Sequence, residues 1–134
     1  MFTSADQKRL LHYALGDAAA ALFFGLFSSI YEHFSHGVYS DAMICAYTVP
    51  LAGGTLLMLL LLRFSDRLRQ PSPGILVLWH AGLAAFTVGL VFLGVLEIYG
   101  TTNRMVAAYP AVGGLMTGSA LLAYAIRREP RTQK

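Results

Sequence analysis

The sequence predicts an all-α membrane protein in which four transmembrane helices form a bundle. Of its 134 residues, 56% are hydrophobic and 13% are charged, whereas about 25% of residues are charged in an ordinary soluble domain. The apolar residues gather in four long runs, and most positive charges lie in the short segments beside them, as they do around membrane helices. This pattern excludes a disordered chain, a secreted disulfide scaffold and a typical soluble enzyme.

Each of the four apolar runs is long enough to cross a bilayer. A helix rises about 1.5 Å per residue, so about 20 residues span about 30 Å of hydrocarbon. Each run must be helical because lipid cannot satisfy free backbone N–H and C=O groups. The predicted spans are residues 10–34, 42–62, 75–98 and 105–126. Short connections make consecutive helices antiparallel neighbours within a single transmembrane domain, residues 1–134.

The positive charges predict the orientation of the spans. Nine of the ten Lys and Arg residues would lie on one side: Lys8, Arg9, Arg63, Arg67, Arg69, Arg127, Arg128, Arg131 and Lys134. Only Arg104 would lie on the other side. The positive-inside rule therefore predicts cytoplasmic termini, in a prokaryotic cytoplasmic membrane. The net charge of +3 reflects this flanking pattern, so we expect no binding to nucleic acid.

Asp17 is the most unusual residue of the first span, because an ionised carboxylate at this depth needs a partner, a proton or water. At about 100° per residue, one helix face carries small and polar residues: Asp17, Ala18, Ala21, Gly25, Ser28 and Glu32. Bulky residues occupy the other side: Leu22, Phe23, Leu26, Phe27 and Ile30. We expect the small and polar face to contact protein and the bulky side to face lipid.

His80 lies at a similar depth on the third span, which runs in the same direction as the first. Its face also carries Thr87, and equal depth predicts an Asp17–His80 pair. The pair has two interpretations: a proton relay or cation-coupled site, and a structural contact that fixes helix register. In the first interpretation, the predicted pathway for protons, ions or substrate consists of Asp17, His80, Glu32, Glu97, Ser28 and Thr87.

Two similar runs of proline and glycine occur in the second and fourth spans. They are Pro50-x-x-Gly53-Gly54 and Pro110-x-x-Gly113-Gly114. One interpretation is a duplication into two parallel two-helix repeats, and the other is that both residues are simply common in membrane helices. Each proline should kink its helix. The glycines should allow close packing or provide a gating hinge, and Gly114-x-x-x-Gly118 predicts contacts in a homodimer or higher oligomer.

The outer end of the predicted bundle collects residues that can bind a metal. His33 and His36 are three apart, which places them on one helix face if the turn stays helical, and Glu32 and Glu97 can complete a divalent-metal site. The alternative interpretation is a solvated cluster at the membrane surface. Haem b is a further candidate cofactor, because membrane cytochromes hold it between two histidines on facing helices. We assume no cofactor in the leading interpretation.

These features favour a small membrane protein that moves a small ion or solute by transport or as a channel, with protonatable residues on the first and third spans. Two alternatives remain. One is a non-catalytic or redox subunit of a larger membrane complex, binding haem or a quinone. The other is a metal-dependent membrane enzyme. No nucleophile–base arrangement or nucleotide-binding loop occurs in the sequence, so we assign no catalytic residue. The expected partners are the lipid bilayer, further copies of the chain and a membrane complex.

Overall fold

The structure, a computed structural model, describes residues 2–127, and within them all regular elements are helices. In chain order its elements are α1 (Ser4–His33), α2 (Asp41–Cys45), the π-helix η1 (Val49–Leu56), α3 (Leu57–Arg63), α4 (Pro73–Tyr99), the 3-10 helix η2 (Arg104–Ala107) and α5 (Ala108–Ile126). Four stretches are long and apolar enough to cross a membrane: Ser4–His33, Asp41–Arg63, Pro73–Tyr99 and Arg104–Ile126. The predicted four-helix membrane bundle is confirmed.

Helix α1 begins at Ser4, ahead of the predicted start of the span at Leu10, because Thr3 and Asp6 cap it. The Thr3 backbone N–H donates to Asp6 Oδ2 at 2.9 Å, and the Asp6 N–H donates to Thr3 Oγ1 at 3.3 Å. This reciprocal pair satisfies N–H groups that a helix start leaves free. The helix therefore begins at its cap, whereas hydropathy detects only where the chain becomes apolar.

The inward face of α1 is the small and polar one, as predicted. Ala21, Ser28 and Glu32 are buried, whereas Leu22 and Phe23 are exposed on the opposite side. In a bilayer the exposed side chains would contact lipid. The small inward residues let the backbone of η1 come close to α1, which is how membrane helices gain packing energy without a hydrophobic driving force.

The second span is built from three helical pieces rather than from one regular helix. Helix α2 ends at Cys45, the π-helix η1 covers Val49–Leu56, and α3 completes the span. Pro50, near the start of η1, has no backbone N–H, so the regular hydrogen-bond ladder of an α-helix is interrupted there. The wider π turns accommodate this interruption. Such turns are rare and frequently occur at functional sites.

Pro110 lies just after the point where the fourth span changes from the 3-10 helix η2 to α5. It is the third residue of α5, which runs without interruption from Ala108 to Ile126. In the first turn of a helix the N–H groups have no partner within that helix, so a proline loses no hydrogen bond there. The two Pro-x-x-Gly-Gly runs therefore have different backbone structures. The run at Pro50 lies in a π-helix, and the run at Pro110 begins an α-helix.

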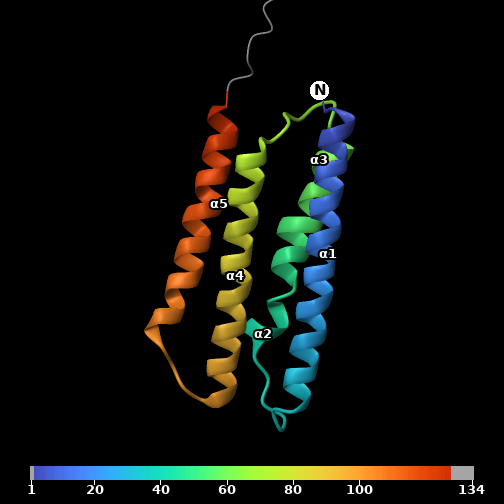
Figure 1. The fold of residues 1–134 in the computed structure, drawn as a ribbon. Helices are drawn as coiled ribbons and strands as arrows, with labels where there is room; N and C mark the ends of the chain where they lie inside the picture. Colours follow the sequence, from blue (N-terminus) through green and yellow to red (C-terminus); the bar gives the residue numbers. More distant parts are fainter. Residues whose placement is uncertain (1, 128–134) are drawn as a thin grey trace, which may run out of the picture.

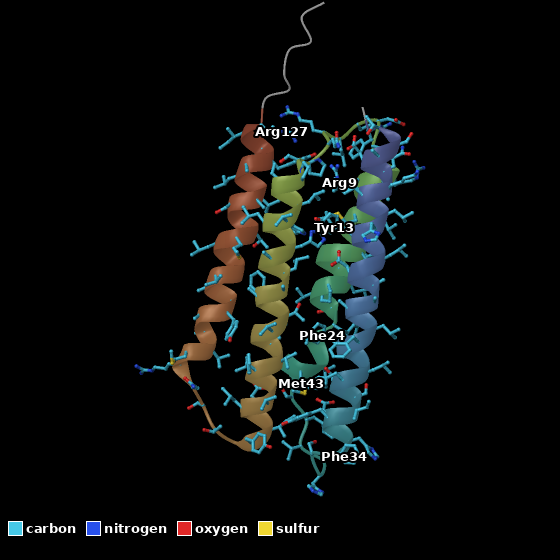
Figure 2. All side chains as sticks on the ribbon, in the orientation of Figure 1. Arg9, Tyr13, Phe24, Phe34, Met43 and Arg127 are labelled. Carbon is cyan, nitrogen blue, oxygen red and sulfur yellow. The ribbon has the colours of Figure 1, made fainter. Side chains whose placement is uncertain are left out.

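The four spans lie side by side in chain order, with α5 at one edge (Figure 1). Helix α1 packs on η1 and α3, α4 packs on α2, η1 and α5, and α5 contacts mainly α4 and η2. The start of α1 and the end of α5 lie at the same end of the bundle, which we call the terminal end. The opposite end is the far end. Figure 2 shows Arg9 and Arg127 at the terminal end and Phe34 at the far end.

Helices α4 and α5 approach each other until their backbones touch. A Cβ atom on Gly82 would lie 2.6 Å from Thr117 Cγ2 and 3.0 Å from the Gly113 carbonyl oxygen, so no side chain fits there. The predicted packing role of Gly113 is thus realised within the chain. Gly114 and Gly118 have open surroundings. A Cβ on Gly114 would meet only a ring atom at 3.9 Å, and one on Gly118 would meet nothing within 4 Å.

Candidate functional site

The Asp17 and His80 side chains meet between α1 and α4, as their equal depth predicted. Asp17 Oδ2 lies 2.8 Å from His80 Nε2, and the two side chains are only about 15% exposed (15% for Asp17 and 14% for His80). Asp17 lies near the middle of α1, far from the capped helix start. Two ionisable groups in direct contact at this depth form the candidate functional site.

The hydrogen bonds of His80 define how many protons the pair holds. His80 Nδ1 lies 2.7 Å from the Leu76 carbonyl oxygen, which can only accept, so Nδ1 carries a proton. One further proton then lies between Nε2 and Asp17 Oδ2. Whether this proton is on the ring or on the carboxyl group, the pair has no net charge. The pair becomes cationic when it gains a proton and anionic when it loses one.

A cavity of about 540 Å³ reaches the pair from the side of the bundle. We call it the pair groove. It is lined by His12, Tyr13, Leu15, Gly16, Asp17 and His80. The ring of Tyr13 stacks on the imidazole of His80, with 4.3 Å between centroids and 26° between planes. This stacking fixes the orientation of the ring, while the pair groove leaves one side of the pair accessible.

Gly54 provides the space that Asp17 occupies. A Cβ atom on Gly54 would lie 2.3 Å from Asp17 Cγ, which is closer than any real contact of this kind. The sequence predicted a role in close packing for Gly54, and the structure gives it a specific neighbour. Because Gly54 belongs to η1, the carboxyl group of Asp17 presses directly against the π-helical backbone.

Residues on both flanking helices hold the π-helix next to the pair. Trp79 Nε1 donates to the Gly53 carbonyl oxygen at 2.8 Å, and Thr55 Oγ1 donates to the Ala14 carbonyl oxygen at 3.0 Å. Gly53 also abuts α4, because its Cβ would lie 2.7 Å from Leu83 Cδ2. Three consecutive residues of η1 are therefore in contact with α1 or α4 beside the ionisable pair.

Trp79, Tyr13 and Thr55 belong to this site but were not predicted from the sequence. Both aromatic residues lie near the ends of predicted spans, where Trp and Tyr commonly form interfacial belts. Trp79 directly precedes His80, and a buried indole N–H needs an acceptor. Pro50 removes the donor for a carbonyl group about one turn earlier in the chain and not for that of Gly53, so no signal in the sequence pointed to this contact.

A second polar cluster joins three elements at the far end. The Ser40 backbone N–H donates to Glu32 Oε1 at 3.1 Å, and the Ser40 hydroxyl donates to Glu97 Oε2. Ser40 is 1% exposed and caps the start of α2. Ser28, one turn before Glu32, donates to the Met43 carbonyl oxygen at 2.7 Å. Glu32, Glu97 and Ser28, three residues of the predicted pathway, thus anchor α2 to its neighbours.

The predicted metal site of His33, His36, Glu32 and Glu97 is not formed. Within residues 2–127, no three His, Cys, Asp or Glu side chains are grouped so as to hold a metal ion. Helix α1 ends at His33, and His36 lies beyond it in a turn with φ of 55°. The two histidines therefore do not share a helix face, and the spacing argument fails because the helix stops between them.

Thr87 was predicted to belong to the pathway, and histidines were predicted as possible ligands of haem b. The Thr87 hydroxyl is buried and donates to the Leu83 carbonyl oxygen of its own helix at 2.9 Å, so it is not joined to the pair. Both ring nitrogens of His80 already have protein partners. Binding of haem b through His80 would require the loss of one of these hydrogen bonds.

No protein-family model, curated protein or solved structure matches this chain.

Proposed function

We propose that the protein is a membrane transporter for a small ion or solute and that the Asp17–His80 pair exchanges the coupled proton. The observation that supports this proposal is the 2.8 Å contact between two protonatable groups inside membrane-spanning helices. Ionisable residues at such depth are expensive, and they commonly mark ion pathways and proton relays. Two uncharged residues would make a purely structural contact with a smaller desolvation cost.

The chemistry of the pair suits proton exchange. It has no net charge with one shared proton, so adding or removing a proton changes the charge of a mostly buried site by one unit. In a medium of low dielectric constant this change alters the local free energy by several kcal/mol. The pair groove offers a route by which a proton could arrive, and His12 lies along that groove.

Coupling would pass through the π-helix. Asp17 touches Gly54 of η1, so a change in the charge of the pair acts on the segment that interrupts the second span. Interrupted helices commonly form the binding sites of membrane transporters, because their free backbone groups can contact substrate. In this scheme, protonation shifts the contact between α1 and η1 and thereby the position of the outer half of the span.

The charge distribution supports an orientation for this transporter. Lys8, Arg9, Arg127 and the arginines between α3 and α4 belong to the terminal end, and Arg104 belongs to the far end. By the positive-inside rule the terminal end faces the cytoplasm. The pair groove, which includes His12 in the first half of α1, then opens nearer the cytoplasmic side.

The test is proton movement in reconstituted vesicles. Purified protein is placed in liposomes that contain the pH dye pyranine, and outward gradients of sodium, potassium, magnesium and ammonium are applied in turn. We expect at least one gradient to drive proton flux above that of protein-free vesicles. Asp17→Asn, which keeps size and hydrogen bonding but cannot ionise, should reduce that flux about tenfold or more.

Asp66→Asn is the matched control. It makes the same chemical change at an exposed carboxylate between α3 and α4, away from the pair, and should leave the flux unchanged. Size-exclusion chromatography and circular dichroism confirm that both variants fold. A folded Asp17→Asn protein with wild-type flux would contradict the proposal, as would wild-type protein that moves no protons under any of the four gradients.

A further inference from the structure

A second cavity, of about 480 Å³, lies at the far end between α1 and the end of α4. We call it the aromatic cavity. It is lined by Phe27, Ile30, Tyr31, Phe34, Ser35, His36, Ile98 and Tyr99. Figure 2 shows Phe34 at this end of the molecule. Half of the lining residues are Phe or Tyr, and Phe34 and Tyr99 are mostly exposed, so the cavity is open to its surroundings.

The rings come from both helices. The centroids of Phe27 and Tyr31 on α1 are 5.9 Å apart with planes tilted by 32°, and Tyr99 of α4 lines the same cavity. The face of an aromatic ring carries negative charge density and attracts a cation within about 6 Å of its centroid. Several rings around one space are the arrangement that recognises methylated ammonium groups.

The surrounding charges favour a cation as well. The far end carries three carboxylates, Glu32, Asp41 and Glu97, against the single cation Arg104, a formal charge of −2. Glu32 and Glu97 already accept hydrogen bonds from Ser40, so they contribute a negative potential rather than a free ligand. No carboxylate lines the aromatic cavity. A metal ion would lose strongly bound water there without gaining a carboxylate ligand. A weakly hydrated organic cation loses less hydration energy and therefore fits this cavity better.

We infer that the aromatic cavity binds a small free alkylammonium cation. The volume of about 480 Å³ falls within the usual range for sites that bind small molecules. This inference does not depend on proton exchange at Asp17, because Tyr31 lies fourteen residues farther along α1, about 21 Å at about 1.5 Å per residue. Failure of either idea leaves the other to be judged on its own experiment.

The experiment measures the binding of radiolabelled choline by equilibrium dialysis, with protein in dodecyl maltoside, a detergent without an ammonium group. The neutral isostere 3,3-dimethylbutan-1-ol competes in a second arm. We expect choline to bind about tenfold or more tightly than this alcohol, since only choline carries the charge that the rings attract.

Variants locate the site. Tyr31→Leu should weaken choline binding about tenfold, whereas Tyr31→Phe, which keeps the ring, should stay within about threefold of the wild type. Phe92→Leu is the control, because Phe92 is an exposed aromatic residue of α4 outside the aromatic cavity. Equal binding of choline and the alcohol, an unchanged Tyr31→Leu protein, or no choline binding at millimolar concentration would overturn the inference and leave the rings as an interfacial belt.

A last arm distinguishes a free cation from a lipid headgroup. Choline binding is compared in nanodiscs of phosphatidylglycerol and in nanodiscs of phosphatidylcholine, whose headgroup is itself a choline ester. Equal binding in both supports a free cation as the occupant. Loss of binding only in phosphatidylcholine would show that the headgroup occupies the aromatic cavity and would overturn the assignment to a free cation.

Discussion

Asp17 has room in its span because Gly54 lacks a side chain, and it has a partner because His80 faces it. The second condition was predictable from sequence, since α1 and α4 run in the same direction and the two residues lie at similar depth. The first was not. A period of 3.6 residues cannot give the rotation of the second span, because the π turns of η1 change which residues point toward α1.

Gly54→Ala tests this contact. The added Cβ would lie 2.3 Å from Asp17 Cγ, so the carboxyl group or the backbone of η1 must move. Overpacking of this kind costs about 1–3 kcal/mol, and we expect a loss of this size in the free energy of unfolding. The measurement is unfolding by dodecyl sulfate in mixed micelles, with the proton flux assay alongside.

Gly114→Ala is the matched control, because Gly114 occupies the same place in the second Pro-x-x-Gly-Gly run. Its added Cβ would meet only Phe86, at an ordinary distance of 3.9 Å. We expect a change within about 0.5 kcal/mol for this variant. Equal losses for the two alanines would mean that Gly54 is not specifically required beside Asp17.

The helices themselves were predictable in number and position but not in internal form. Hydropathy identifies a span because lipid requires every backbone group to be satisfied within a helix. It cannot show that residues 49–56 form π turns, or that the indole N–H of Trp79 on another helix donates to a carbonyl group of these turns. The end of α1 at His33 lies one residue before the predicted end of the span, but the chain does not stay helical as far as His36, so the predicted metal site is not formed.

Trp79→Phe tests whether the neighbouring helices hold η1 in place. The variant keeps an aromatic ring but leaves the Gly53 carbonyl oxygen without its donor at 2.8 Å. A lost hydrogen bond of this kind costs about 1 kcal/mol or more, which corresponds to about fivefold in a local opening equilibrium. We expect amide hydrogen exchange over residues 49–56 to be faster by about that factor, with little change in α5.

Tyr124→Phe is the control for Trp79→Phe. It also removes one side-chain donor, in this case to the Arg69 carbonyl oxygen at 2.8 Å, at an exposed position of the terminal end. Exchange over residues 49–56 should be unaffected. If both variants, or neither, accelerate exchange there, the indole of Trp79 does not specifically hold the π-helix.

At the scale of the whole molecule, α5 stands apart because its main packing partner is the single helix α4. Its Gly113 side is occupied by Gly82, while Gly118 meets nothing within 4 Å. Small open faces on membrane helices favour close approach of another helix. We therefore propose a homodimer or higher oligomer that uses the Gly118 side of α5.

Gly118→Leu should weaken this association, because a large side chain would keep a second helix at a distance. Ser119→Leu is the control, since Ser119 is exposed on an adjacent face of the same helix. The oligomeric state of each protein is measured by light scattering in mild detergent. A wild type that is strictly monomeric in detergent and in lipid would contradict the prediction, as would an oligomer that Gly118→Leu leaves intact.

Because the first helix starts and the last helix ends at the same end of the bundle, two copies can be joined in tandem by a linker that never enters the membrane. Such a fusion forces both copies to point the same way. Whether the fusion works therefore tests whether the copies in an assembly are parallel. A head-to-tail concatemer accommodates only partners in parallel orientation, and one mutated copy can be matched with one intact copy to count how many sites a working assembly needs.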